Sequence, residues 1–304
     1  GTPASWCRHR PVARPKRPLT TAKQKTTGQE VTGVATAPAP LIAEHSAAVA
    51  FRQTIALAKR STLELFRQPA LVVPSLIFPL FFSFLGNSSF GRTTSLPGFP
   101  KVNSYLQFQL AGTITQGVLF GSVTGAAALA TDIENGFFYR LLAAPTARTS
   151  ILFGRLAGST LFGALETAVF VLVLLPFGAD VSAGLPGIIA MIISGALIAL
   201  AVGALMSSVA LKTGSAEAVQ GTFPLLFILL FFSSAFFPRE TMSGAYKTIA
   251  GINPISHLVE GLRALSLEGF SISATARAIL VPLAIAVVAL FVANRQLQKR
   301  LRAN

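Results

Sequence analysis

The sequence is short of charge. Only 12% of its 304 residues are Asp, Glu, Lys or Arg, whereas a soluble domain carries about 25%. A water-facing surface of this size cannot be covered by so few charges. The single cysteine, Cys7, excludes a disulfide framework within the chain. Glycine has no three-residue period, which excludes a collagen-like chain.

Residues for catalysis and nucleotide binding are also lacking. The chain contains no Gly-Lys pair, so it has no GxxxxGK[ST] loop to cradle the phosphates of ATP. His9, His45 and His257 are far apart and, with Cys7, offer no metal-ligand spacing. No Ser, His and acid cluster indicates a nucleophile. We therefore expect a protein that is not an enzyme by itself and binds neither cofactor nor metal.

Long apolar runs take the place of charge, and 52% of the residues are hydrophobic. A membrane-spanning helix needs roughly 20 apolar residues, and an isolated segment in lipid must satisfy its backbone as a helix. Five charge-free runs and one run interrupted only by Glu166 meet this need. The sequence thus predicts an all-α polytopic membrane protein. Its six predicted transmembrane helices lie at about 70–86, 106–130, 156–178, 186–210, 220–237 and 278–294.

The distribution of Lys and Arg predicts the orientation. With six spans, 19 basic residues fall on the side that holds both termini and six on the opposite side. Within residues 52–304 alone the split is 12 against six. Because basic residues favour the cytoplasmic side, both termini are expected in the cytoplasm.

Two extramembrane segments precede the first span. Residues 1–45 are rich in Pro, Thr, Ala, Lys and Arg, so we expect a disordered basic tail. Without an apolar h-region it is not a signal peptide. It is either a tether to anionic membrane lipids or dispensable, and nucleic acid is not expected as a partner.

Residues 46–68 have the spacing of an amphipathic helix. The expected apolar face comprises Phe51, Ile55, Ala58, Thr62 and Leu65. Such a helix either lies in the membrane interface or packs on a partner protein.

The loop between the second and third spans predicts a short cytoplasmic helix. Asp132 and Glu134 suit the positive start of a helix. Leu141 and Leu142 supply an apolar face, and Pro145 should end the helix. This element either docks in a groove of a cytoplasmic partner or rests on the lipid surface.

The segment before the last span predicts a second short helix, on the outer side. Apolar residues recur there with helical period after the Asn253–Pro254 turn, and Glu260 and Arg263 lie three apart. This is either a re-entrant helix, which needs protein or water around it at membrane depth, or a surface helix.

Two features lie inside the predicted spans. Glu166 is costly there if charged, so it is either a cation-contacting or proton-binding residue or a protonated packing residue. Gly117, Gly121 and Gly125 form a GxxxGxxxG stripe. This stripe lets helices approach closely, within the chain or across a dimer interface.

Two motifs resemble those of ABC-2-type transporter permeases, especially the drug-resistance subgroup. TDIENGFFYRLLAAPTARTSILFGR resembles the family's cytoplasmic loop, and INPISHLVEGLRAL resembles its segment before the last span. The chain departs from the pattern at Tyr139, where an acidic residue is common.

The resemblance implies a permease domain over 46–304, with residues 132–150 as the coupling helix. The ATPase-coupling residues would be Asp132, Glu134, Gly136, Tyr139, Arg140, Leu141, Leu142, Pro145 and Arg148. The outer-gate residues would be Asn253, Pro254, His257, Glu260 and Arg263.

The same resemblance implies an assembly and a function. Two permease copies, expected as a homodimer, would each bind a separate ATPase in the bacterial plasma membrane. The complex would export a hydrophobic drug, antibiotic or lipid-like substrate. Three alternatives stay open: export of polysaccharide or glycolipid, proton-coupled secondary transport through Glu166, and a membrane-anchored partner protein that transports nothing.

Overall fold

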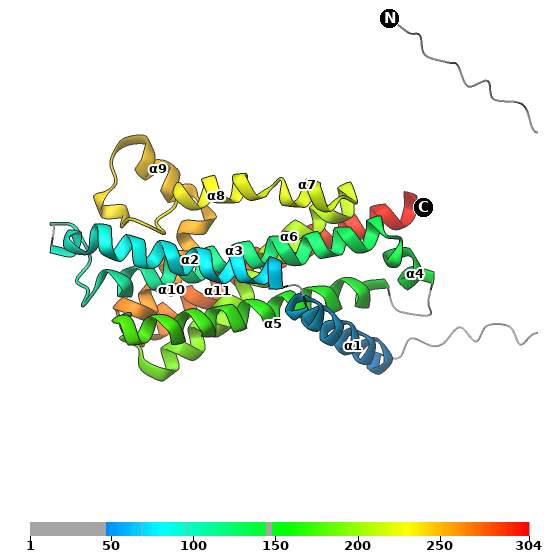
Figure 1. Ribbon diagram of the computed structural model, residues 1–304, viewed down its shortest axis with the longest axis horizontal. Helices are drawn as coiled ribbons and strands as arrows, with labels where there is room; N and C mark the ends of the chain where they lie inside the picture. Colours follow the sequence, from blue (N-terminus) through cyan, green and yellow to red (C-terminus); the bar gives the residue numbers. More distant parts are fainter. Residues whose placement is uncertain (1–46, 68, 96, 144–147, 304) are drawn as a thin grey trace, which may run out of the picture. The chain divides into compact units, whose positions relative to one another are not determined.

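The chain folds into α-helices and short 3-10 turns, with no strand in the described residues. The computed structural model describes residues 47–303 except 68, 96 and 144–147, so the predicted tail over 1–45 lies outside it. Five helices are long and apolar enough to cross a membrane, which confirms an all-α polytopic membrane protein (Figure 1). They are α2 (Pro69–Phe90), α3 (Tyr105–Glu134), α5 (Arg148–Leu174), α6 (Gly184–Thr213) and α11 (Ile272–Ala303).

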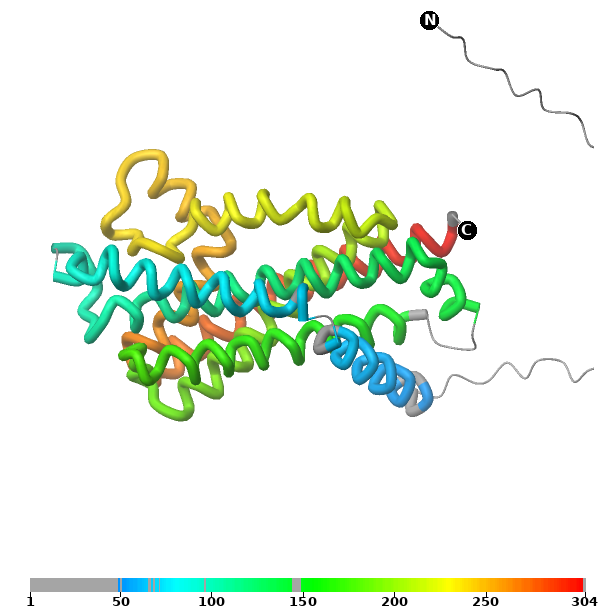
Figure 2. The backbone as a smooth tube through the Cα atoms, in the orientation of Figure 1, coloured from blue at the N-terminus to red at the C-terminus, as the bar shows by residue number. Residues whose placement is uncertain are grey.

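The shorter elements lie at the two ends of this bundle (Figures 1 and 2). One end, here named the α4 end, holds α4 (Phe137–Ala143), the start of α7 (Ala216–Gln220) and the last turn of α11. The other, named the α9 end, holds α9 (Gly244–Ile252) and the start of α10 (Pro254–Leu267). The described residues also form three 3-10 turns, Gly91–Ser95, Leu175–Phe177 and Arg239–Thr241.

The segment predicted as the fifth span is shorter than expected. It contains α8 (Phe223–Phe231), which continues α7 after a break at Gly221 and Thr222. Pro224 lies in the first turn of α8, where a missing N–H costs nothing. The helix ends at Phe231, whereas the prediction ran to 237. Residues 232–237 are not helical, and Ser256 Oγ accepts a hydrogen bond from Ser234 N at 3.1 Å.

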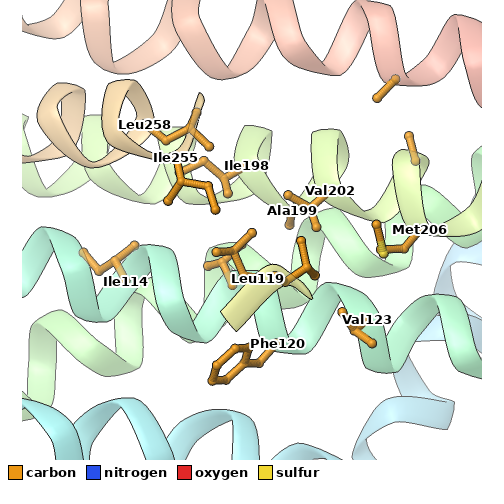
Figure 3. Packing of buried hydrophobic residues seen from close by; sticks show 14 of the residues in the cluster. Ile114, Leu119, Phe120, Val123, Ile198, Ala199, Val202, Met206, Ile255 and Leu258 are labelled. Carbon is orange, nitrogen blue, oxygen red and sulfur yellow. The ribbon is translucent and has the colours of Figure 1, made fainter. Parts of the chain in front are cut away.

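Helix α3 is the centre of the bundle. In its apolar segment 89% of the residues are buried, compared with 22% in α2 and 28% in α11. Its side chains pack against α6 and α10, as Figure 3 shows for Leu119, Ile198 and Leu258. Large apolar side chains such as Leu172 and Val288 point outward on the peripheral helices. An outer surface of this kind suits lipid and does not suit water.

The predicted amphipathic helix over 46–68 is present as α1 (Ala47–Phe66). It packs along α5. Glycines of α5 let the two helices approach closely, since a Cβ added to Gly154 would lie 2.5 Å from Leu57 Cβ. Phe51 and Ile55 face away and are 66% and 52% exposed. These two members of the predicted apolar face are thus available to lipid or to another protein, whereas Ala58 and Thr62 are half-buried beside α5.

Close contact between α5 and α6 depends on small residues. A Cβ added to Gly163 would lie 2.3 Å from Ala199 Cβ, and one added to Gly195 would lie 1.9 Å from Thr167 Oγ1. Transmembrane helices associate through such surfaces, because lipid offers little hydrophobic drive for helix pairing.

We predict that Gly163→Ala lowers the free energy of unfolding by about 1–3 kcal/mol, because overpacking forces neighbouring atoms apart. Gly251→Ala is the matched control: this helical glycine has no atom within 4 Å of an added Cβ, so the change should stay within about 1 kcal/mol. Thermal unfolding in mild detergent compares the two variants. Equal losses would contradict the packing assigned to Gly163.

Candidate functional site

A cluster of ion pairs at the α4 end joins three helices. Arg155 of α5 pairs with two carboxylates. Its Nη1 lies 2.8 Å from Glu64 Oε2 of α1, and its Nη2 lies 3.0 Å from Asp132 Oδ2 of α3. Arg60 Nη2 of α1 adds a longer contact, 3.9 Å from Asp132 Oδ1. The Arg155 side chain is only 9% exposed. Because these opposite charges are poorly solvated, their attraction fixes the ends of α1, α3 and α5 relative to one another.

The expectation that Asp132 and Glu134 begin a helix is wrong. Both lie in the last turn of α3, which continues through them and ends at Glu134. Asp132 next to the negative helix end is balanced by the Arg155 ion pair. Glu134 instead serves the start of another helix, because its Oε1 accepts a hydrogen bond from Ala216 N of α7 at 2.8 Å.

A left-handed glycine turns the chain from α3 into α4. Gly136 has φ +71°, a conformation that a side chain disfavours. After this turn Phe138 is buried in the core, and Leu141 and Leu142 pack partly against it. Arg60 lies over the Phe137 ring at 4.0 Å, as a cation–π contact. Helix α4 is therefore held against the bundle by its aromatic residues.

The outer face of α4 presents Tyr139 and Arg140, both exposed. Arg140 lies 5.5 Å from the Phe137 ring centroid, so its stem rests on α4 itself. Tyr139 Oη accepts a hydrogen bond of 2.8 Å from Arg300 Nη2 of α11. Arg300 Nη1 also donates to Leu211 O of α6 at 2.6 Å. At position 139 the family often has an acidic residue, and this chain has a neutral tyrosine. The tyrosine nevertheless contacts a cation, Arg300.

Helix α4 ends at Ala143, Pro145 is outside the described residues, and Arg148 begins α5.

At the α9 end, Asn253 holds the start of α10. Its Oδ1 accepts from Ile255 N at 2.9 Å, which caps the helix. Its Nδ2 donates to Leu229 O at 2.6 Å and to Phe232 O at 3.0 Å. Pro254 occupies the first helical position, as the N-terminal preference of proline predicts. One side chain thereby ties α10 to the end of α8.

The charged residues of α10 do not pair with each other. Glu260 Oε1 lies 2.8 Å from Arg239 Nε. Arg263 is 7% exposed, donates to Ala235 O at 3.1 Å and to Phe108 O at 3.4 Å, and covers the Phe108 ring. Burial lowers the pKa of Arg263 to about 10, so it stays charged at neutral pH. His257 Nε2 lies 3.1 Å from Gly251 O.

Glu166 lies between the two ends, buried among α2, α3 and α5. Its Oε1 accepts a hydrogen bond of 2.7 Å from Ser75 Oγ, and only 1% of the residue is exposed. Gly121 makes room for it, since an added Cβ would lie 2.5 Å from Glu166 Oε2. Gly117 and Gly125 likewise face α5, so the GxxxGxxxG stripe packs within the chain.

An apolar cavity of about 550 Å³ adjoins this region. Phe78 of α2, Phe120 of α3 and Phe223 of α8 form its walls, and Ser75 and Thr124 add hydroxyl groups. Volume and lining match those of pockets for small apolar molecules.

Sequence reasoning missed the partners of these residues. Glu64 is the only carboxylate within α1, yet its pairing with Arg155 links residues 91 positions apart. In the sequence, Arg300 of α11 is one basic residue among several, and nothing there indicates its partner. Glu64 stands out as the one carboxylate of a basic helix, and this pattern could have indicated an ion pair.

We predict that Arg155→Gln lowers the free energy of unfolding by about 3–5 kcal/mol, because two partly buried carboxylates lose their cation. Arg277→Gln is the control, since both side chains of its Glu268 pair are 57% exposed and such pairs contribute about 0–1 kcal/mol. Thermal unfolding in detergent measures both. A loss no larger for Arg155 than for Arg277 would refute the structural role of the cluster.

Comparisons with known proteins agree with this arrangement. The family model for ABC-2 type transporters matches residues 52–267. The daunorubicin resistance ABC transporter permease protein DrrB1 of Streptomyces coeruleorubidus is 33% identical over 198 residues, 64% of this chain and 66% of that protein. The chain thus spans just under two thirds of that relative.

Two further relatives extend the comparison. The putative transport permease ycf38 of Porphyra purpurea is 30% identical over 213 residues, 68% of this chain and 72% of that protein. Its counterpart in Cyanophora paradoxa is 28% identical over 220 residues, 70% and 74% of the two chains. The family match covers α1 to α10, including the α4 loop and the Asn253 cap. This chain therefore belongs to the ABC-2 type transporter family.

Proposed function

We propose that the chain is the membrane subunit of an ATP-driven exporter and that a separate ABC ATPase docks on α4. The observation that carries the proposal is the two-sided character of this helix. Its outer face exposes Tyr139 and Arg140, while Phe138 beneath them is 2% exposed. An exposed polar surface fixed to a buried anchor is what a docking element needs in order to transmit force.

Movement of α4 would pass directly to the long helices. Phe138, Asp132 and Arg155 line one small pocket, so a push on α4 would reach the ion pairs that join α1, α3 and α5. The Tyr139–Arg300 hydrogen bond carries the same movement to α11. Alternating access in this scheme is a shift of packed helices, driven from the α4 end.

The proposed substrate is a hydrophobic or amphipathic small molecule. The apolar cavity with its phenylalanine walls supports this substrate class. The printed name of the DrrB1 relative, a daunorubicin resistance permease, points the same way. The active unit in our proposal is a homodimer with two ATPase subunits in a bacterial plasma membrane.

The proposed orientation places the α4 end in the cytoplasm. Among the described residues, the α9 end carries Arg92, Lys101, Arg239, Lys247, Arg263 and Arg277. The other Lys and Arg residues of 52–302 lie in or directly after α1 and in α4, α5, α6 and α11, toward the α4 end, and they outnumber these two to one. The positive-inside rule then assigns the α4 end to the cytoplasm.

Cysteine labelling tests this orientation. In a Cys7→Ser background, Ser95→Cys should react in intact cells with a membrane-impermeant maleimide, because Ser95 is exposed at the α9 end. Asn135→Cys, exposed at the α4 end, should react only after the membrane is permeabilised. The reverse pattern would invert the proposed topology.

The ATPase partner is tested by purification of the tagged chain from native membranes. Arg140→Glu should reduce the retained ABC ATPase at least tenfold, because charge reversal at a docking contact adds repulsion. Arg302→Glu, an exposed arginine of α11 at the same end, should retain it as the wild type does. Mass spectrometry quantifies the ATPase in both.

The outcomes separate the proposed function from its alternatives. Retention by wild type and Arg302→Glu with loss in Arg140→Glu supports docking on α4. Equal retention in both variants would contradict α4 as the docking site. No ATPase with the wild type under mild detergent would contradict the exporter, and Glu166→Gln would then test proton-coupled transport.

A further inference from the structure

A second cavity, of about 420 Å³, opens at the α9 end and is distinct from the apolar cavity. We name it the α9-end cavity. The start of α3, the turn after Pro238, α10 and the start of α11 form its walls. Four cationic and three carboxylate side chains line it, so its charge balance is positive.

Arg263 at this cavity is a buried cation without a carboxylate partner. It is 7% exposed, and its hydrogen bonds go to the carbonyl oxygens of Phe108 and Ala235. Among the described residues, no carboxylate lies within ion-pair distance of it. These carbonyl oxygens and the Phe108 ring, whose centroid lies 3.8 Å from the guanidinium carbon, compensate the buried charge in part, and the cavity gives an anion access to it.

The carboxylates of the cavity are largely engaged already. Glu260 pairs with Arg239 at 2.8 Å, and Glu268 pairs with Arg277 at 3.2 Å. Glu240 is exposed to solvent. The remaining cation, Lys101, is exposed and forms no ion pair in the described residues. Two cations, Arg263 inside and Lys101 outside, and one carboxylate, Glu240, thus remain without an ion pair among the described residues, which leaves a net positive charge for an added anion.

We propose that the α9-end cavity binds a phosphate group, held between the Arg263 guanidinium and the Lys101 ammonium. Several oxygens on one anion can accept from both groups, and charge-assisted hydrogen bonds are the strong ones. Phe108, Pro238 and Leu267 add apolar wall, which suits whatever carries the phosphate. Binding there does not depend on export or on an ATPase.

Inorganic phosphate and a phospholipid headgroup present the same chemistry, so the experiment has two arms. The full-length chain is purified in a neutral detergent, and its melting temperature is measured against rising inorganic phosphate at constant ionic strength in chloride. In the second arm, dioctanoyl phosphatidic acid is compared with dioctanoylglycerol, which lacks only the phosphate. A saturable rise in melting temperature gives the apparent Kd.

Lys101→Glu is the test variant, and Lys247→Glu is its control. Both lysines are exposed at the α9 end, but Lys247 does not line the cavity. Lys101→Glu should weaken binding roughly tenfold, the factor that corresponds to about 1.4 kcal/mol. Arg263 is left in place because it also holds two backbone carbonyls, and its loss would disturb the fold itself.

The arms identify the source of the phosphate. Lys101-dependent binding of inorganic phosphate supports a site for the free ion. Lys101-dependent binding of phosphatidic acid alone supports a headgroup site. Absence of a saturable effect in both arms, or equal weakening by Lys247→Glu, would overturn the proposal.

Discussion

The contact between α3 and α5 depends on three positions that have no side chain. Gly117, Gly121 and Gly125 face Phe170, Glu166 and Ser159, and an added Cβ would lie within 2.7 Å of each. Because α3 is the buried centre of the bundle, this contact also sets where α2 and α6 pack. A polar carboxyl group inside the bundle is tolerated there, since Gly121 gives it space and Ser75 gives it a hydrogen bond.

Charge-free length and helical spacing were sufficient to predict the class of fold. The long helices, α1 and α10 all appear where apolar runs or apolar periodicity place them. The predicted end of the fifth span was less accurate, because hydropathy does not show where a helix ends. Residues 232–237 leave the helix since Ser256, Asn253 and Arg263 supply hydrogen bonds that lipid cannot supply.

The loop after α3 shows a different limit of sequence reasoning. Acidic residues favour a helix start only if a helix begins there. At Asp132 the preceding helix had not yet ended, and a cation from α5 changed the local balance. Tertiary partners 23 or 91 positions away were beyond any local pattern. The family resemblance singled out Asp132 and Glu134 without revealing which residues they contact.

The two ends of the bundle differ in what their polar contacts join. At the α4 end, ion pairs and a cation–π contact join α1, α3, α4 and α5 to one another. At the α9 end, Asn253 and Arg263 donate to carbonyl oxygens of the irregular segment after α8, beside the Arg239–Glu260 ion pair. Because hydrogen bonds are directional, these contacts hold a backbone that lacks helical hydrogen bonds in one conformation.

The ion-pair cluster also has a consequence for biogenesis. Its members come from α1, α3 and α5, and Arg155 is the last of them to leave the ribosome. Until α5 is made, Glu64 lacks its partner in the cluster, and Asp132 has only the longer contact with Arg60. The arrival of the third span, α5, therefore completes the ion-pair cluster and joins α1 to α3 before α6 to α11 have been made.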